Sequence, residues 1–144
     1  MTRALVVDDD ETIRDTLYEL LSENYICQTA ETAEKAIARL QADTYDVVLT
    51  DISMPGLSGL ELLGQVRQRY PQTPVIVISG ISDKEHAQGL IRLGAFDYLL
   101  KPFSLDEVEK SVKRAVDYRR QLIDQSVGKG TSSDEDTSDW KIVT

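Results

Sequence analysis

Five polar residues each lie at or just after the end of a short apolar run. Asp8 and Asp9 follow the first run, Asp51 ends the third, Ser79 follows the fourth, and Lys101 follows the fifth. Carboxylates that lie close together repel one another unless a cation or protons neutralise them, and hard oxygen ligands favour Mg²⁺. A hydroxyl and an ammonium group can bind phosphoryl oxygens, and a carboxylate can attack phosphorus to form an acyl phosphate. These residue types predict a magnesium-dependent phosphoryl-transfer site if the fold brings them together.

Apolar runs alternate along the chain with amphipathic stretches, which is typical of βαβ units in a parallel sheet. The expected strands are residues 4–7, 25–28, 46–51, 75–78 and 96–100. The third run is apolar on both alternating sets of positions, which predicts a central strand buried on both faces. Five strands that alternate with five helices predict an open, doubly wound α/β sandwich with helices on both faces. The carboxyl ends of such strands share one edge of the sheet, so the polar residues should meet there.

Several helix starts carry capping residues. Ser104 and Glu107 have the spacing of a capping box. Asp10 fits equally well as the N-cap of the first helix and as a functional carboxylate, and both interpretations stay open. From about residue 128 the composition shifts to Gly, Ser, Thr and Asp, which is typical of a flexible tail. We therefore expect a folded domain over residues 1–125 and a flexible polar tail over residues 126–144.

The composition argues against several classes of function. The chain of 144 residues has a formal charge of -9, which repels nucleic-acid backbones and anionic lipid headgroups. We expect no direct binding of nucleic acid, and no apolar run is long enough to cross a membrane. The single cysteine, Cys27, cannot form an internal disulfide, which favours a reducing compartment, the cytoplasm.

Four short segments carry a family resemblance. The chain resembles a response regulator receiver domain of two-component signalling over about residues 3 to 122, and the spacing of the segments is highly specific. The segments are Val6-Val7-Asp8-Asp9-Asp10, Thr50-Asp51 with Met54-Pro55-Gly56-Leu57-Ser58-Gly59, Ile78-Ser79-Gly80, and Tyr98-Leu99-Leu100-Lys101-Pro102-Phe103. The expected fold is accordingly flavodoxin-like, with strand order 2-1-3-4-5.

The resemblance assigns a role to each polar residue at the sheet edge. Asp51 would accept a phosphoryl group from a phosphohistidine of a sensor histidine kinase or phosphotransfer protein. Asp8, Asp9, Asp51 and the backbone carbonyl of Ser53 would hold Mg²⁺. Ser79 and Lys101 would contact the phosphoryl oxygens, and a cis peptide between Lys101 and Pro102 would aim the lysine. The chain would then catalyse its own magnesium-dependent phosphorylation and dephosphorylation, without being an enzyme in the ordinary sense.

The resemblance also implies a switch. On phosphorylation the Ser79 hydroxyl would move toward the new phosphoryl oxygens, and Tyr98 would turn into the vacated space. The surface formed by the fourth helix, fifth strand and fifth helix, about residues 83 to 120, would then bind an output domain, a partner protein or a second copy of the chain. An apolar residue at Ile81 would hinder the attacking water, so we expect slow self-dephosphorylation that Ile81→Ala accelerates.

Two other classes of function compete with this interpretation. The run Asp8-Asp9-Asp10-Glu11-Thr12 also fits the D-x-D-x-T pattern of haloacid-dehalogenase-like phosphatases, with Asp8 as the nucleophile and Asp10 as the general acid. That family needs a further acidic cluster after a strand, and here only helix-borne acids follow Lys101. An interaction module without chemistry is the other alternative, but the acceptor, acidic pair, hydroxyl and lysine are all present. The single histidine, His86, is expected to be solvated.

Overall fold

The computed structural model describes residues 2–54, 56, 58–80 and 84–131 and contains one parallel five-stranded sheet. The strands follow the order β2-β1-β3-β4-β5, which confirms the flavodoxin-like fold expected from the sequence. Their bounds are β1 Arg3–Val7, β2 Ile26–Ala30, β3 Val47–Asp51, β4 Val75–Ser79 and β5 Asp97–Leu100.

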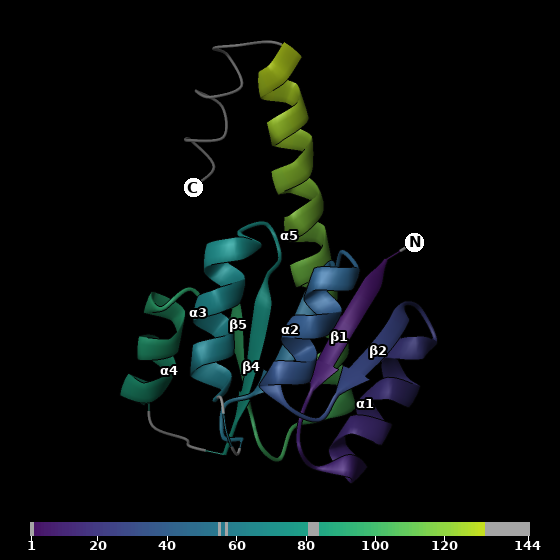
Figure 1. Cartoon of the computed structure of the whole chain (residues 1–144), viewed down its shortest axis with the longest axis vertical. Helices are drawn as coiled ribbons and strands as arrows, with labels where there is room; N and C mark the ends of the chain where they lie inside the picture. The colour runs from purple at the N-terminus through teal and green to yellow at the C-terminus, as the bar shows by residue number, and fades with distance from the viewer. Residues whose placement is uncertain (1, 55, 57, 81–83, 132–144) are drawn as a thin grey trace.

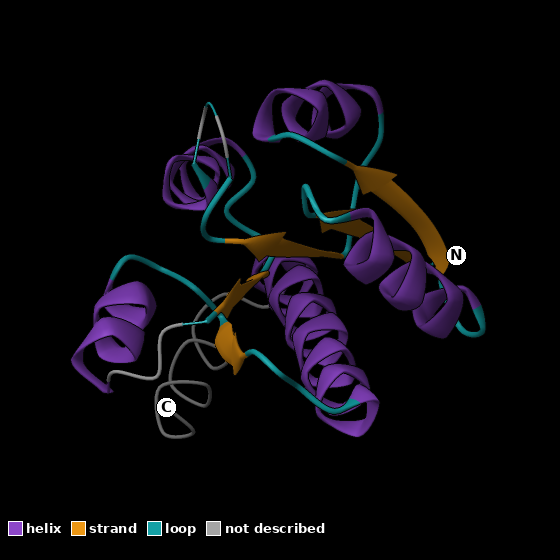
Figure 2. Ribbon diagram, turned by 90° about the horizontal axis from the view of Figure 1, so that it is seen from below, coloured by secondary structure: helices purple, strands orange, loops and turns teal. Residues whose placement is uncertain are grey.

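Helices cover both faces of the sheet, as Figures 1 and 2 show. Three of them pack on one face and two on the other. The first face carries α2 (Ala33–Ala42), α3 (Gly59–Arg69) and α4 (Lys84–Arg92), and the second carries α1 (Glu11–Ser22) and α5 (Leu105–Thr131). Within the described part of the chain, no helix combines the length and apolarity needed to cross a membrane.

The core follows the two-residue period of the strands. In β1, Leu5 and Val7 join the core beneath α2 and α3, whereas Ala4 and Val6 join the core beneath α1 and α5. Every residue of β3 and of β4 is buried, so both are covered on both faces, as the apolar runs predict. Burial of each large apolar side chain contributes about 1.5–3 kcal/mol, so these strands hold the sheet edge in place.

The capping residues fix where the helices begin. The Asp10 side chain accepts hydrogen bonds from the backbone N–H groups of Thr12 and Ile13, so this residue is the N-cap of α1. Ser104 and Glu107 form the predicted capping box at the start of α5. A second capping box, which our sequence analysis did not identify, links Ser58 and Glu61 and starts α3 one residue inside the expected loop.

The edge strand β2 ends two residues later than expected. Polar residues at its carboxyl end hide the strand in the sequence, but Thr29 pairs with Val6 and Ala30 pairs with Val7 in the parallel register. Pairing with β1 therefore extends β2 where its own side chains give no apolar signal.

The last helix extends past the sheet beyond the amino ends of the strands (Figure 1). The middle of the helix is tied to that edge, because Arg119 Nη1 lies 2.8 Å from Asp46 Oδ1 and Asp46 Oδ2 accepts a hydrogen bond of 2.7 Å from the backbone N–H of Arg3. The helix continues to Thr131, six residues beyond the expected end of the domain. The division of the chain at residue 125 stays a prediction.

Candidate functional site

The sheet brings the polar residues together at the carboxyl edge. Asp51 and Ser79 are the last residues of β3 and β4, which are neighbours in the sheet. Asp8 directly follows β1, and Lys101 directly follows β5. Four strands therefore deliver two carboxylates, a hydroxyl and an ammonium group to one edge.

Three carboxylates form a tight acidic group. One oxygen each from Asp8, Asp9 and Asp51 lies within 4.8 Å of the others. Asp8 and Asp51 are buried, whereas Asp9 is exposed and leaves the group open to solvent on one side. This donor set, hard oxygens with one exposed face, is the kind that Mg²⁺ takes while it keeps water and a phosphoryl oxygen in its other positions.

The buried carboxylate of Asp8 tests this fit directly. Its Oδ1 accepts a 2.9 Å hydrogen bond from the backbone N–H of Asp10, but its Oδ2 is buried and accepts no hydrogen bond from the described residues. A buried acceptor without a donor is costly. A cation held by the acidic group would satisfy this oxygen, so the residues present fit a divalent metal.

The environment of Asp8 also raises its pKa, from 3.8 to about 6. Burial is the largest cause, because it penalises the charged form, and the negative charges of Asp51 and Asp9 add to it. The hydrogen bond from Asp10 and the positive charge of Lys101 oppose the shift without cancelling it.

Lys101 supplies the positive charge of the site. Its Nζ lies 3.1 Å from Asp51 Oδ2 and 3.9 Å from Asp8 Oδ2. The peptide bond between Lys101 and Pro102 is cis, as the resemblance implies. The Lys101 backbone N–H donates a 2.8 Å hydrogen bond to the carbonyl of Ser79, which ties the lysine to the end of β4.

Two further contacts hold Asp51 in place. Its Oδ1 accepts a 3.1 Å hydrogen bond from the backbone N–H of Ser53, so Oδ1 and Oδ2 have different partners. The backbone of Gly59 lies against the backbone of Asp51, and a Cβ on Gly59 would lie 2.1 Å from the Asp51 carbonyl oxygen. Only glycine permits α3 to begin this close to the end of β3.

The proposed switch residues lie on the neighbouring strands β4 and β5. Ser79 is fully buried, and Tyr98 is half-buried and packs against the core beneath α2 and α3. The expectation that His86 is solvated is wrong. Its ring lies edge-on to Tyr98, with 6.1 Å between the ring centroids, and its Nε2 is buried, because α4 turns this residue toward β5. Ile81, which we expect to slow dephosphorylation, lies outside the described residues.

One residue near the site escaped the sequence analysis. Arg14 Nη1 donates a 2.8 Å hydrogen bond to the backbone carbonyl of Asp8. The bond depends on the orientation of α1 relative to β1, and a single arginine on an amphipathic helix gives no signal of it.

Comparison with known proteins agrees with this geometry. Residues 4–113 match the protein family described as the response regulator receiver domain. The chain belongs to the response regulator receiver family. Over 117 residues, or 81% of its length, the receiver is 44% identical to the DNA-binding transcriptional regulator NtrC of Salmonella typhimurium.

Solved structures show the same relationship. The receiver superposes on NtrX from Brucella abortus with a TM-score of 0.85 and 33% identity, covering 94% of this chain and 31% of that one. A receiver domain protein from Clostridium thermocellum matches 85% of the chain with a TM-score of 0.77 and 30% identity, and 99% of that protein is covered. The chain spans about a quarter of the length of the curated relatives it matches, such as NtrC.

Proposed function

We propose that this receiver is a phosphorylation switch in which Asp51 accepts a phosphoryl group in a magnesium-dependent reaction. The observation that carries the proposal is the pair of Lys101 Nζ and Asp51 Oδ2 at 3.1 Å, next to a buried Asp8 oxygen with no hydrogen-bond donor among the described residues. Asp8, Asp9, Asp51 and the Ser53 carbonyl would hold Mg²⁺, which supplies the positive charge that offsets the carboxylates and the incoming phosphoryl group.

The chemistry assigned to the protein groups is one substitution at phosphorus. An Asp51 carboxylate oxygen forms a bond to phosphorus while the bond from phosphorus to the phosphohistidine nitrogen breaks, and the imidazole leaves with the electron pair of that bond. Lys101 moves its contact from the Asp51 oxygen toward the phosphoryl oxygens, whose negative charge it stabilises. The Ser79 hydroxyl donates a further hydrogen bond to the transferred group.

An apolar pocket beside Lys101 supports a protein as the phosphoryl donor. The pocket has a volume of about 430 Å³ and joins the start of α1 to the start of α5. Its lining residues are Thr12, Ile13, Thr16, Lys101, Pro102, Phe103 and Leu105. A protein that presents a phosphohistidine to Asp51 must contact the surface beside Lys101. We therefore assign the pocket to the sensor histidine kinase or phosphotransfer protein. The lone Cys27 is consistent with a cytoplasmic reaction.

The output belongs to the opposite flank of the site. Ser79 ends β4, Tyr98 lies in β5, and His86 connects Tyr98 to α4. Movement of Ser79 toward a phosphoryl group would free space for Tyr98 and change the surface of α4, β5 and α5. We assign this surface to an output domain, a downstream protein or a second receiver. NtrC is a DNA-binding regulator by name, but the receiver alone, at a charge of -9, is expected to bind no nucleic acid.

Phosphoryl uptake from a small donor tests the proposal without the unknown kinase. Incubation with phosphoramidate and Mg²⁺ should add the mass of one phosphoryl group to the intact protein. The addition should be absent with EDTA and in Asp51→Asn, and Lys101→Ala should slow it by at least about tenfold. Asp43→Asn, at an exposed position after α2, is the matched control and should react like the wild type. Equal uptake by Asp51→Asn and the wild type would refute the proposal.

A further inference from the structure

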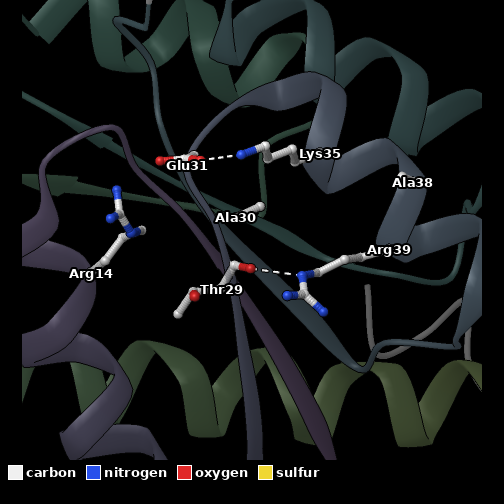
Figure 3. Close-up of a pocket in the computed structure, with 7 residues that line it drawn as sticks. All are labelled: Arg14, Thr29, Ala30, Glu31, Lys35, Ala38 and Arg39. Carbon is white, nitrogen blue, oxygen red and sulfur yellow. Dashed lines mark hydrogen bonds and ion pairs between the residues drawn. The ribbon is translucent and has the colours of Figure 1, made fainter.

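A second pocket lies at the edge of the sheet, away from Asp51. It has a volume of about 480 Å³ and is formed by α1, the carboxyl end of β2 and α2 (Figure 3). Its lining residues are Arg14, Thr29, Ala30, Glu31, Lys35, Ala38 and Arg39. Three of these are cations and one is an anion, which makes the pocket locally basic in a protein with a charge of -9.

Two of the cations in the pocket, Arg14 and Arg39, donate hydrogen bonds to neutral backbone carbonyl groups. Arg39 Nε donates a 2.7 Å hydrogen bond to the carbonyl of Thr29, and Arg14 Nη1 donates to the carbonyl of Asp8. A neutral carbonyl oxygen orients a guanidinium group without neutralising it, although the charge of Arg14 also acts on Glu31, whose pKa is lowered mainly by Lys35 and in part by Arg14. Neither arginine makes an ion pair within the part of the chain that the structure describes, whereas Lys35 pairs with Glu31. Figure 3 shows the two guanidinium groups on either side of Thr29 and Ala30.

The lining restricts the ligand class. Planar guanidinium groups bind phosphate through paired hydrogen bonds, and Arg is the residue best suited to that geometry. The volume lies within the range of small-molecule sites, about 300–1,000 Å³, and exceeds what a single phosphate ion needs. The neutral part of the wall consists of two alanine methyl groups and Thr29, with no aromatic ring on which a base could stack.

We infer that the pocket formed by Arg14, Lys35 and Arg39 binds a small, non-aromatic organic phosphate. Lys35 and Arg39, one turn apart on α2, contact the phosphate group, and Lys35 exchanges its exposed contact with Glu31 for the ligand. Arg14, on the α1 side of Thr29 and Ala30, adds positive charge to the pocket. The Thr29 hydroxyl and the alanine methyl groups contact the remainder of the molecule.

Two backbone hydrogen bonds of Asp8 connect the pocket to the acidic site. The Asp8 backbone N–H donates a 3.1 Å hydrogen bond to the carbonyl of Ala30, and the Asp8 carbonyl accepts the 2.8 Å bond from Arg14. Both backbone groups of Asp8 therefore contact residues that line the pocket. A bound anion that attracts the Arg14 guanidinium changes its hydrogen bond to the Asp8 carbonyl. Binding at each of the two sites must then change the affinity of the other reciprocally. This coupling, unlike the binding itself, rests on the proposed function.

Amide chemical shifts provide the test. The Asp51→Asn protein, metal-free in EDTA and at constant ionic strength, is titrated with glycerol 3-phosphate, with inorganic phosphate and with sodium chloride. We expect saturable shifts at Thr29, Ala30 and Glu31 with glycerol 3-phosphate. Arg39→Gln and Lys35→Gln should each weaken binding at least about tenfold, as expected for loss of a charge-assisted contact. Lys113→Gln removes an exposed lysine from α5 and should change nothing.

The same titration can overturn the inference. Shifts that do not saturate, that respond equally to sodium chloride, or that survive both Arg39→Gln and Lys35→Gln contradict a built site. Saturation by inorganic phosphate alone contradicts the organic phosphate class. Because Asp51→Asn lacks the acceptor and EDTA removes the metal, failure here leaves the proposed function of Asp51 standing, and failure of phosphorylation leaves this pocket standing.

Discussion

At the scale of single residues, the site is organised around one carboxylate, Asp8, whose ionised form is destabilised by its environment. Asp8 is buried, lacks a hydrogen-bond donor for Oδ2 among the described residues, and has its pKa raised to about 6. In the metal-free protein these features oppose the ionised form. The unfavourable state of Asp8 is the physical reason that a cation should bind here strongly.

A substitution at Asp8 tests that view through stability. The raised pKa means that the Asp8 carboxyl binds a proton more tightly in the metal-free folded protein than in the unfolded chain. The contribution of Asp8 to stability is therefore most favourable below about pH 4 and falls as the pH rises through about 6. Asp8→Asn removes this fall. We expect the metal-free variant to be on the order of 2–3 kcal/mol more stable than the wild type at pH 7.

Urea unfolding in EDTA at several pH values measures the difference. Asp15→Asn, at an exposed position of α1, serves as the control and should follow the wild-type pH profile. Equal changes in the free energy of unfolding between pH 4 and 7 in the wild type and in Asp8→Asn would contradict the role given to this carboxylate.

The residues of the site differ in how far the sequence predicts them. Asp8, Asp51, Ser79 and Lys101 interrupt or end apolar runs, so strand periodicity alone brings them to one edge. Arg14 acts through a backbone carbonyl, and its contact depends on how α1 packs, which no local pattern encodes. The environment of His86 was predicted incorrectly because a polar stretch says nothing of the neighbouring strand.

At the scale of elements, α3 must begin against the end of β3. The Gly59 Cβ position lies 2.1 Å from the Asp51 carbonyl oxygen and 2.7 Å from Ile52 Cα, and neither backbone atom can move without displacing the acceptor. Close packing of this junction, together with the Ser58 cap, fixes the loop that carries Ser53.

Two glycine substitutions in the same helix separate this contact from helix propensity. Gly59→Ala should destabilise the protein by at least about 2 kcal/mol, because it forces backbone atoms apart. Gly64→Ala meets no atom within 4 Å and should stabilise the protein by roughly 0.5–1 kcal/mol. Denaturant unfolding of both variants measures these effects, and equal effects on stability would exclude the close approach.

A second test at this scale concerns the pocket between α1 and α5. Leu105 begins α5 and is 45% exposed, so Leu105→Glu keeps the fold and places an acid where a helix start favours one. With a kinase that phosphorylates the wild type, transfer should slow about tenfold, since an apolar contact is lost. Uptake from phosphoramidate should not change.

The matched control for that test is Leu93→Glu. Leu93 is 60% exposed, follows α4 and lies outside the pocket beside Lys101. Kinase transfer should be normal in this variant. Slower transfer to Leu93→Glu than to Leu105→Glu would indicate that the donor contacts α4 and not the pocket beside Lys101.

Element boundaries show the limit of prediction at this scale. The apolar runs of β3 and β4 predict these strands from the sequence, and the Ser104 capping box marks the start of α5. The end of β2 is missed because Thr29 and Ala30 become strand through pairing with β1, which is a tertiary effect.

At the scale of the molecule, the proposed function assigns different partners to the two sides of the site. In the function that we propose, the phosphoryl donor contacts the side of α1 and the start of α5, and the output partner contacts α4, β5 and the rest of α5. The output side carries exposed apolar side chains at Ile91, Leu93, Leu100 and Tyr118. The ion pair of Arg119 with Asp46 fixes the direction in which α5 leaves the sheet.

Sedimentation tests whether a second receiver covers the output side. Beryllofluoride with Mg²⁺ mimics the phosphoryl group, and we expect it to convert a monomer into a dimer. Asp51→Asn should stay monomeric under the same conditions, and Leu93→Glu should weaken the dimer. An unchanged wild-type monomer would exclude phosphorylation-driven dimerisation through this surface.

Mapping the modified residue tests whether Asp51 is the phosphoryl acceptor. The receiver is treated with phosphoramidate and Mg²⁺, trapped with borohydride, digested and sequenced by mass spectrometry. We expect modification at Asp51 alone. Modification at Asp8, the nucleophile in the phosphatase alternative, would contradict it.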